Sequence, residues 1–115
     1  MENKKEATIE IKVALDENKI PEKISWKSSD APTPQFEECK AFMLALWDKE
    51  RKQTLKVDLY TKEMQIDEMD FFVMQTLYTM SDFYAKATNK KETAELFRKF
   101  ALEFSESSGI AKKKT

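Results

Sequence analysis

Alternation of apolar and polar residues predicts a first pair of strands. In the segment 8–16, every second side chain is apolar, a period typical of a strand with one buried face. The apolar positions are Ile9, Ile11, Val13 and Leu15. A shorter alternation around 24–26 follows turn residues and Pro21, which keeps the preceding residue extended. These two segments are predicted to form a hairpin, and the serine- and proline-rich stretch 28–34 a loop.

The segment 40–47 suits either a buried helix or a buried strand, because it contains an uninterrupted apolar run. The polar stretch 48–53 and a cleanly alternating segment, 54–61, follow it. A strand of that quality needs a neighbour, so 40–47 and 54–61 are predicted to form a second hairpin. Its core-facing residues on the first strand would be Phe42, Leu44 and Leu46. Met43, Ala45 and Trp47 would make the other face unusually apolar.

The pattern then changes to a helical period. Asp67 is predicted to cap the first helix, and Ile66 to pack against Phe71 as a hydrophobic staple. Asn89, followed three residues later by a glutamate, is predicted to cap a second helix that ends before Gly109. The first helix carries a wide apolar face: Met69, Phe72, Val73, Thr76, Leu77, Met80, Phe83, Tyr84 and Ala87. A second stripe, almost opposite, contains Phe71, Met74, Tyr78 and Ala85. The second helix carries Leu96, Phe97, Phe100, Ala101 and Phe104.

Four strands followed by two helices predict an α+β fold. The four strands would form one antiparallel sheet of two hairpins, and the two C-terminal helices would pack on it. The first helix would contact the sheet through Met69, Phe72, Val73, Leu77 and Met80. A chain of 115 residues favours a single domain, 1–115, with flexible ends at 1–6 and 110–115.

Composition excludes several function classes. The chain has no histidine, one cysteine and one glycine, so histidine-dependent catalysis, histidine metal sites, zinc knuckles, iron–sulfur sites and glycine-rich phosphate loops are excluded. Its 20 basic and 21 acidic residues argue against nucleic-acid binding. No apolar run approaches the length of a membrane span, and residues 1–6 lack a signal peptide's apolar stretch. We therefore expect a cytoplasmic protein without cofactor, metal or catalytic residues.

Two groups of side chains keep a chemical alternative open. Asp67, Glu68 and Asp70 could hold a cation, although acids at a helix N-terminus more often favour its dipole. Asp48 and Asp58 could form an acid pair across the second hairpin, which would suit a small carboxylate-dependent enzyme. Separately, Cys39 lies beside Lys40, which could activate its thiol; a small, partly buried hydrophobe is the commoner role.

The most informative feature is surplus apolar surface. The outer face of 40–47 and the second stripe of the first helix cannot both face water comfortably. The predicted interaction surface is Met43, Trp47, Phe71, Met74 and Tyr78. The second helix should cover part of the stripe, and a homodimer the rest. The order of four strands before two helices is also that of the SecB export chaperone, an analogy of element order only.

Several stretches together resemble the gliding motility protein GldC family of Bacteroidetes. In the first half they are Leu15-Asp16-Glu17-Asn18, Ile20-Pro21-Glu22-Lys23-Ile24 with Trp26, and Lys40-Ala41 with Met43-Leu44 and Trp47-Asp48. In the second half they are Thr54-Leu55-Lys56-Val57-Asp58-Leu59-Tyr60-Thr61-Lys62, Asp67-Glu68-Met69, Gln75-Thr76-Leu77, Met80 and Ala87-Thr88-Asn89. The resemblance covers residues 8–105 and contains no catalytic motif.

This resemblance implies a small accessory protein of gliding motility, a process tied to a dedicated secretion system. Together with the missing catalytic residues, it favours a non-enzymatic protein that acts by binding proteins of the gliding or secretion machinery. The alternative is a small export-chaperone-like binding protein of the cytoplasm, and a carboxylate-dependent enzyme ranks third.

Overall fold

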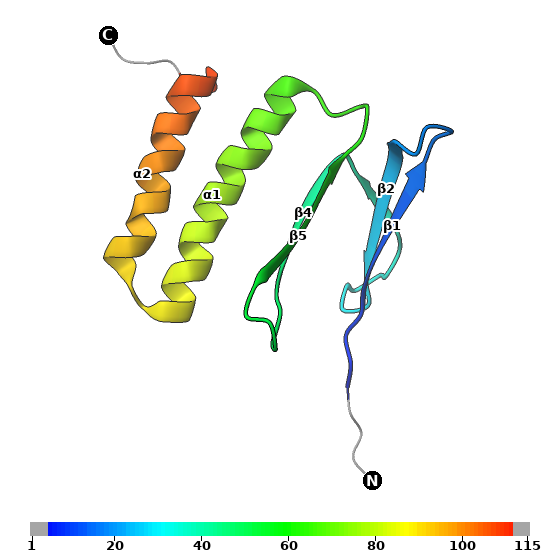
Figure 1. Cartoon of the computed structure of the whole chain (residues 1–115), viewed down its shortest axis with the longest axis horizontal. Helices are drawn as coiled ribbons and strands as arrows, with labels where there is room; N and C mark the ends of the chain where they lie inside the picture. The colour runs from blue at the N-terminus through cyan, green and yellow to red at the C-terminus, as the bar shows by residue number, and fades with distance from the viewer. Residues whose placement is uncertain (1–4, 112–115) are drawn as a thin grey trace. The chain divides into compact units, whose positions relative to one another are not determined.

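The computed structural model describes residues 5–111, which divide into two compact units on either side of the Met64–Gln65 bond. Within this range the first unit contains five strands and the second two helices (Figure 1). The α+β class is therefore confirmed. Of the predicted flexible ends at 1–6 and 110–115, residues 1–4 and 112–115 lie outside the described residues.

The first hairpin has the predicted strands. β1 (Ile9–Leu15) pairs antiparallel with β2 (Pro21–Ser28), and the register sets Ile11 opposite Trp26 and Val13 opposite Ile24. Residues opposite each other lie on the same face of a sheet, so one face of this hairpin is apolar and the other is charged. Ile24 is almost completely buried, with 1% of its surface exposed.

The strand after the loop changes its partner halfway along. β3 (Glu37–Cys39) pairs with β2, whereas β4 (Ala41–Trp47) pairs with β5 (Thr54–Tyr60), and only Lys40 separates β3 from β4. The prediction of a strand over 40–47 is confirmed, but that of one four-stranded sheet is wrong. The strands form a three-stranded sheet and a two-stranded sheet. The short, acidic β3 has no apolar alternation, so only its pairing with β2 defines it.

The two helices end where the backbone adopts a left-handed conformation. α1 spans Ile66–Thr88 and ends at Asn89, whose φ is 59°; α2 spans Lys91–Ser108 and ends at Gly109, whose φ is 91°. Asparagine and glycine tolerate this conformation best, so both residues suit a helix C-cap. Gly109 thus ends α2 as predicted. Asn89 ends α1, so its predicted role as the N-cap of the second helix is wrong; Lys90 holds that position.

The start of α1 also differs from the prediction. Gln65, not Asp67, is the N-cap, and its backbone N–H donates to the Glu68 carboxylate over 3.1 Å. Asp67 lies in the first turn and accepts a hydrogen bond from the Glu68 N–H. A glutamate at the third helical position can satisfy the N-cap amide, and this contact moves the helix start two residues earlier than the aspartate suggested.

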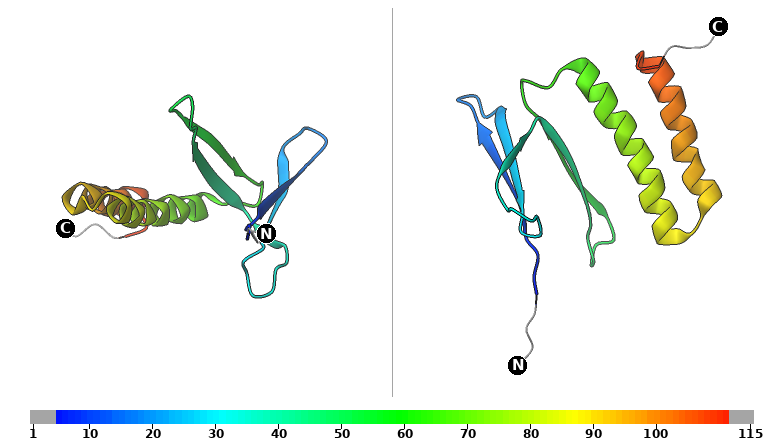
Figure 2. Two further views of the ribbon diagram at one scale, coloured as in Figure 1. Left: turned by 90° about the horizontal axis from the view of Figure 1, so that it is seen from below. Right: turned by 180° about the vertical axis from the view of Figure 1, so that it is seen from behind.

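α1 and α2 pack side by side as antiparallel neighbours, as the right-hand view of Figure 2 shows. The buried residues between them are small: Ser81 on α1 and Ala94, Ala101 and Ser105 on α2. The Ser81 hydroxyl donates to the Ala94 carbonyl over 2.8 Å. Small side chains at these positions allow close contact between the helices. The packing of both helices on the sheet, and the single domain, stay predictions.

Candidate interaction surface

One face of the β4–β5 hairpin is entirely apolar. The register sets Phe42 opposite Leu59, Leu44 opposite Val57 and Leu46 opposite Leu55. We call these six residues the sheet surface. Of its members, Leu46, Leu55 and Val57 keep 51%, 42% and 47% of their surface exposed. A patch of this kind is unusual on a surface that only water contacts, because burying each large apolar side chain gains about 1.5–3 kcal/mol.

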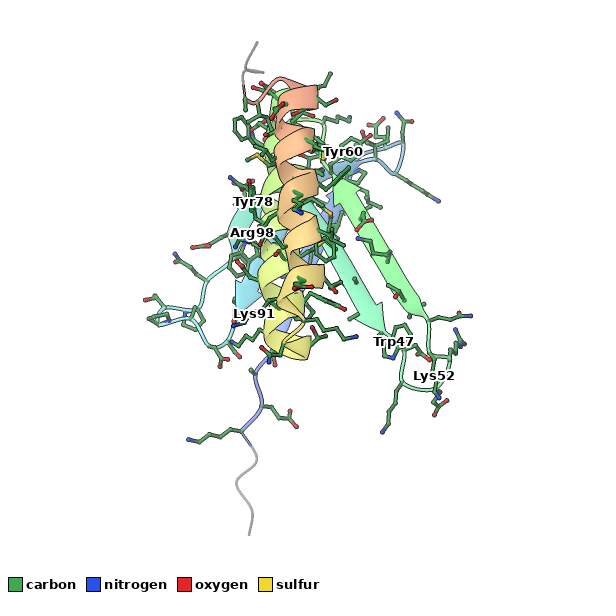
Figure 3. The ribbon with its side chains drawn as sticks, turned by 90° about the vertical axis from the view of Figure 1, so that its left-hand side faces the viewer. Trp47, Lys52, Tyr60, Tyr78, Lys91 and Arg98 are labelled. Atoms are coloured by element: carbon green, nitrogen blue, oxygen red, sulfur yellow. The ribbon has the colours of Figure 1, made fainter. Side chains whose placement is uncertain are left out.

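The opposite face of the same hairpin is mixed and carries the two predicted strand residues. Met43 lies opposite Asp58, and Trp47 lies opposite Thr54. Met43 is half-buried, whereas Trp47 is 67% exposed. In Figure 3, Trp47 lies at the loop end of the hairpin and Tyr60 at the other end. The two predicted residues therefore share a face with charged neighbours.

The helical unit has one apolar side and one polar side. On the first side the rings of Tyr84 and Phe97 are in contact, with centroids 6.2 Å apart. At about 100° per residue, the same side carries a group of exposed apolar residues, which we call the helix surface. Its members are Met80, Phe83, Leu96 and Phe100, which are 44%, 78%, 60% and 54% exposed.

On the polar side, an arginine of α2 contacts two side chains of α1. The Arg98 guanidinium of α2 donates to the carboxylate of Asp82 on α1 over 2.7 Å. The same guanidinium lies 5.4 Å from the centre of the Tyr78 ring, also on α1 (Figure 3). The hydrogen bond with Asp82 is the main reason why the pKa of Arg98 is raised, so the guanidinium stays charged. Tyr78 thus contacts α2. On the same stripe of α1, Met74 is half-buried and Phe71 is 45% exposed.

The carboxylates singled out in the sequence have separate local contacts. Asp48 accepts a hydrogen bond from the Arg51 N–H in the hairpin loop, and Asp58 pairs with Lys56 at 2.9 Å on β5. The contacts of Asp67 and Glu68 cap α1. Within residues 5–111, no three histidine, cysteine or acidic side chains are arranged to hold a metal ion.

Another carboxylate, Asp16, forms a denser local cluster. It accepts hydrogen bonds from the Asn18 and Ile20 N–H groups over 2.8 and 3.0 Å and forms an ion pair with Lys62. The hydrogen bond from Lys62 is the main cause that lowers the pKa of Asp16, and in return Asp16 raises the pKa of Lys62. This cluster ties the β1–β2 turn to the segment that follows β5.

Cys39 lies opposite Ile24 in the β2–β3 pair. Burial raises the pKa of its thiol, while a backbone hydrogen bond from Ala41 lowers it to a lesser extent. A raised pKa reduces the fraction of reactive thiolate at neutral pH. The structure therefore favours the hydrophobic role for Cys39 over the reactive one.

A comparison with protein families decides the broader identity. The family model described as gliding motility-associated protein GldC-like matches residues 21–110, more than three quarters of the chain. The chain belongs to the GldC-like family. No curated protein and no solved structure shows a significant match to it.

Both surfaces of this GldC-like protein lie inside the matched range. The sequence pattern indicated the apolar positions of β4 and β5, but not the cross-strand register that joins them into one face. The sequence pattern also missed the contact of Arg98 with α1, because the periodicity of α2 does not distinguish Arg98 from the other charged residues of that helix. In the described part of the chain, no helix is long and apolar enough to cross a membrane.

Proposed function

We propose that this GldC-like protein is a non-enzymatic accessory protein of gliding motility. In this role it binds proteins of the gliding or secretion machinery in the cytoplasm. The observation that carries the proposal is the helix surface, where Phe83 and Leu96 expose most of their area on one side of a well-packed helix pair. An apolar face of this kind fits the apolar groove or helix of a protein partner.

The test is genetic, in a gliding bacterium whose own copy of the gene has been deleted. Phe83→Asp and Phe100→Asp place charges on the helix surface, and Lys99→Asp places one at an exposed position elsewhere on α2. We expect wild type and Lys99→Asp to restore colony spreading, and the two phenylalanine variants to fail at equal cellular abundance. Restoration by both phenylalanine variants would contradict a role for this surface.

The same observation favours a second candidate, a chaperone-like protein that binds unfolded chains before export. Exposed apolar residues on both units would suit clients without a fixed shape. Here the purified protein should suppress aggregation of a chemically denatured test protein at near-stoichiometric ratios, and Phe83→Asp should weaken that effect. If aggregation proceeds unchanged, the chaperone-like function is wrong and the specific-partner function is preferred.

A further inference from the structure

β5 has a strand on one edge only. Within residues 5–111 it pairs with β4 alone. The ladder between them is bounded by hydrogen bonds from the Thr61 N–H to the Lys40 carbonyl and from the Asp48 N–H to the Gln53 carbonyl. Because antiparallel ladders alternate, odd-numbered residues of β5 direct their backbone groups toward β4 and even-numbered residues direct theirs outward. The outward groups belong to Thr54, Lys56, Asp58 and Tyr60.

We propose that this edge pairs with β5 of a second copy of the chain, antiparallel, about a two-fold axis at Val57. In this register Lys56 of each copy lies opposite Asp58 of the other, and Leu55 lies opposite Leu59. Opposite charges at directly opposed positions stabilise a strand pair. Residues 56 and 58, whose backbone groups are directed outward, would exchange both N–H and carbonyl contacts across the axis.

The sequence of β5 favours this register over its neighbours. An axis at Lys56 would set two lysines opposite each other, and an axis at Asp58 would set two aspartates opposite each other; both are destabilising. An axis between two residues would oppose charged and apolar side chains, because a one-residue shift exchanges the faces of a strand. Lys56 and Asp58 already lie on one face, since their side chains pair within the chain at 2.9 Å.

Pairing would also stabilise an otherwise weak element. A two-stranded hairpin by itself is at best marginally stable in water, whereas a sheet of three or more strands with an apolar face is large enough for independent stability. The dimer would have the strand order β4-β5-β5-β4 and would join two sheet surfaces into one continuous apolar face. A self-complementary contact of this kind is the usual geometry of a homodimer, and it removes an open sheet edge.

The first experiment exchanges charges on the edge. Lys56→Asp makes the edge acidic and Asp58→Lys makes it basic, so each variant would oppose like charges in its own dimer. By light scattering after size exclusion, we expect wild type to be a dimer at micromolar concentration and each variant to dimerise about tenfold or more weakly. An equimolar mixture should recover the dimer mass, with one copy of each variant, because both aspartates of the acidic edge then face lysines of the basic edge. A monomeric wild type, or a mixture that stays monomeric, would overturn the proposal.

The second experiment locates the axis and needs no loss of stability. In a Cys39→Ser background, Val57→Cys would set two cysteines opposite each other at a non-hydrogen-bonded position, where the α-carbons are about 4.5 Å apart. That separation suits a disulfide. Leu55→Cys is the matched control, because the same face of the second copy offers Leu59 there. We expect rapid oxidation to a covalent dimer for Val57→Cys only, and equal rates for both variants would overturn the register.

Both experiments use the purified protein, so they are independent of the proposed gliding function. A covalent dimer at Val57→Cys together with normal spreading of the helix-surface variants would support the dimer and contradict the proposed function.

Discussion

The packing between α1 and α2 leads to a quantitative prediction at Ala101. This side chain has 0% of its surface exposed and shares the helix interface with other small residues. Ala101→Leu adds three carbon atoms at a position where the neighbouring helix leaves no free surface. Overpacking of this kind costs about 1–3 kcal/mol, because side chains or the helix backbone must move. At about 4 °C per kcal/mol for a chain of this size, Tm should fall by roughly 4–12 °C.

The assay is urea and thermal unfolding followed by circular dichroism at 222 nm, at one fixed protein concentration because dimerisation contributes to stability. Ala87→Leu is the matched control, since Ala87 is an exposed helical alanine and leucine has nearly the same helix propensity. We expect the control to change the free energy of unfolding by less than about 0.5 kcal/mol. If Ala101→Leu is tolerated as well as Ala87→Leu, the helices are not closely packed at this position and the reasoning fails.

Four further predictions test other local features. Asp16→Asn should lower the free energy of unfolding at neutral pH, measured by urea titration. Folding lowers the pKa of Asp16, so the ionised carboxylate stabilises the folded state at any pH above its unfolded pKa of about 3.9. The difference between wild type and variant should therefore disappear as pH falls through the pKa of Asp16 in the folded protein. Cys39 should react with iodoacetamide at pH 8 more slowly than glutathione does, and denaturant should remove the protection. Asn89→Ala should cost about 1 kcal/mol in urea unfolding, whereas Asn89→Gly should not, because its φ is positive. Ser81→Ala should cost about 0.5–1.5 kcal/mol by the same measurement, for its lost interhelical hydrogen bond.

The local pattern of the sequence by itself determined where most strands and both helices lie. Strict alternation in β1 and β5 allowed no other regular structure, since a period of two places every apolar side chain on one face only in an extended chain. The ambiguous run before Trp47 became a strand through its neighbour, because β5 needed a partner. The helix end at Gly109 also followed from sequence, since few residues besides glycine accept a positive φ.

Tertiary contacts alone decided the features that periodicity does not encode. The change of partner at Lys40 depends on which strands lie within hydrogen-bonding distance on each side, and the neighbouring residues carry no local signal of it. The register that joins the sheet surface depends on the loop between β4 and β5. Likewise, the periodicity of α1 offers two apolar stripes, but α2 packs along Ser81, which lies between Tyr84 of the wide face and Tyr78 of the second stripe. Phe97 of α2 contacts Tyr84, and Arg98 of α2 contacts Tyr78. Which side of α1 is covered depends on complementary shape between two helices, and no single helix contains that information.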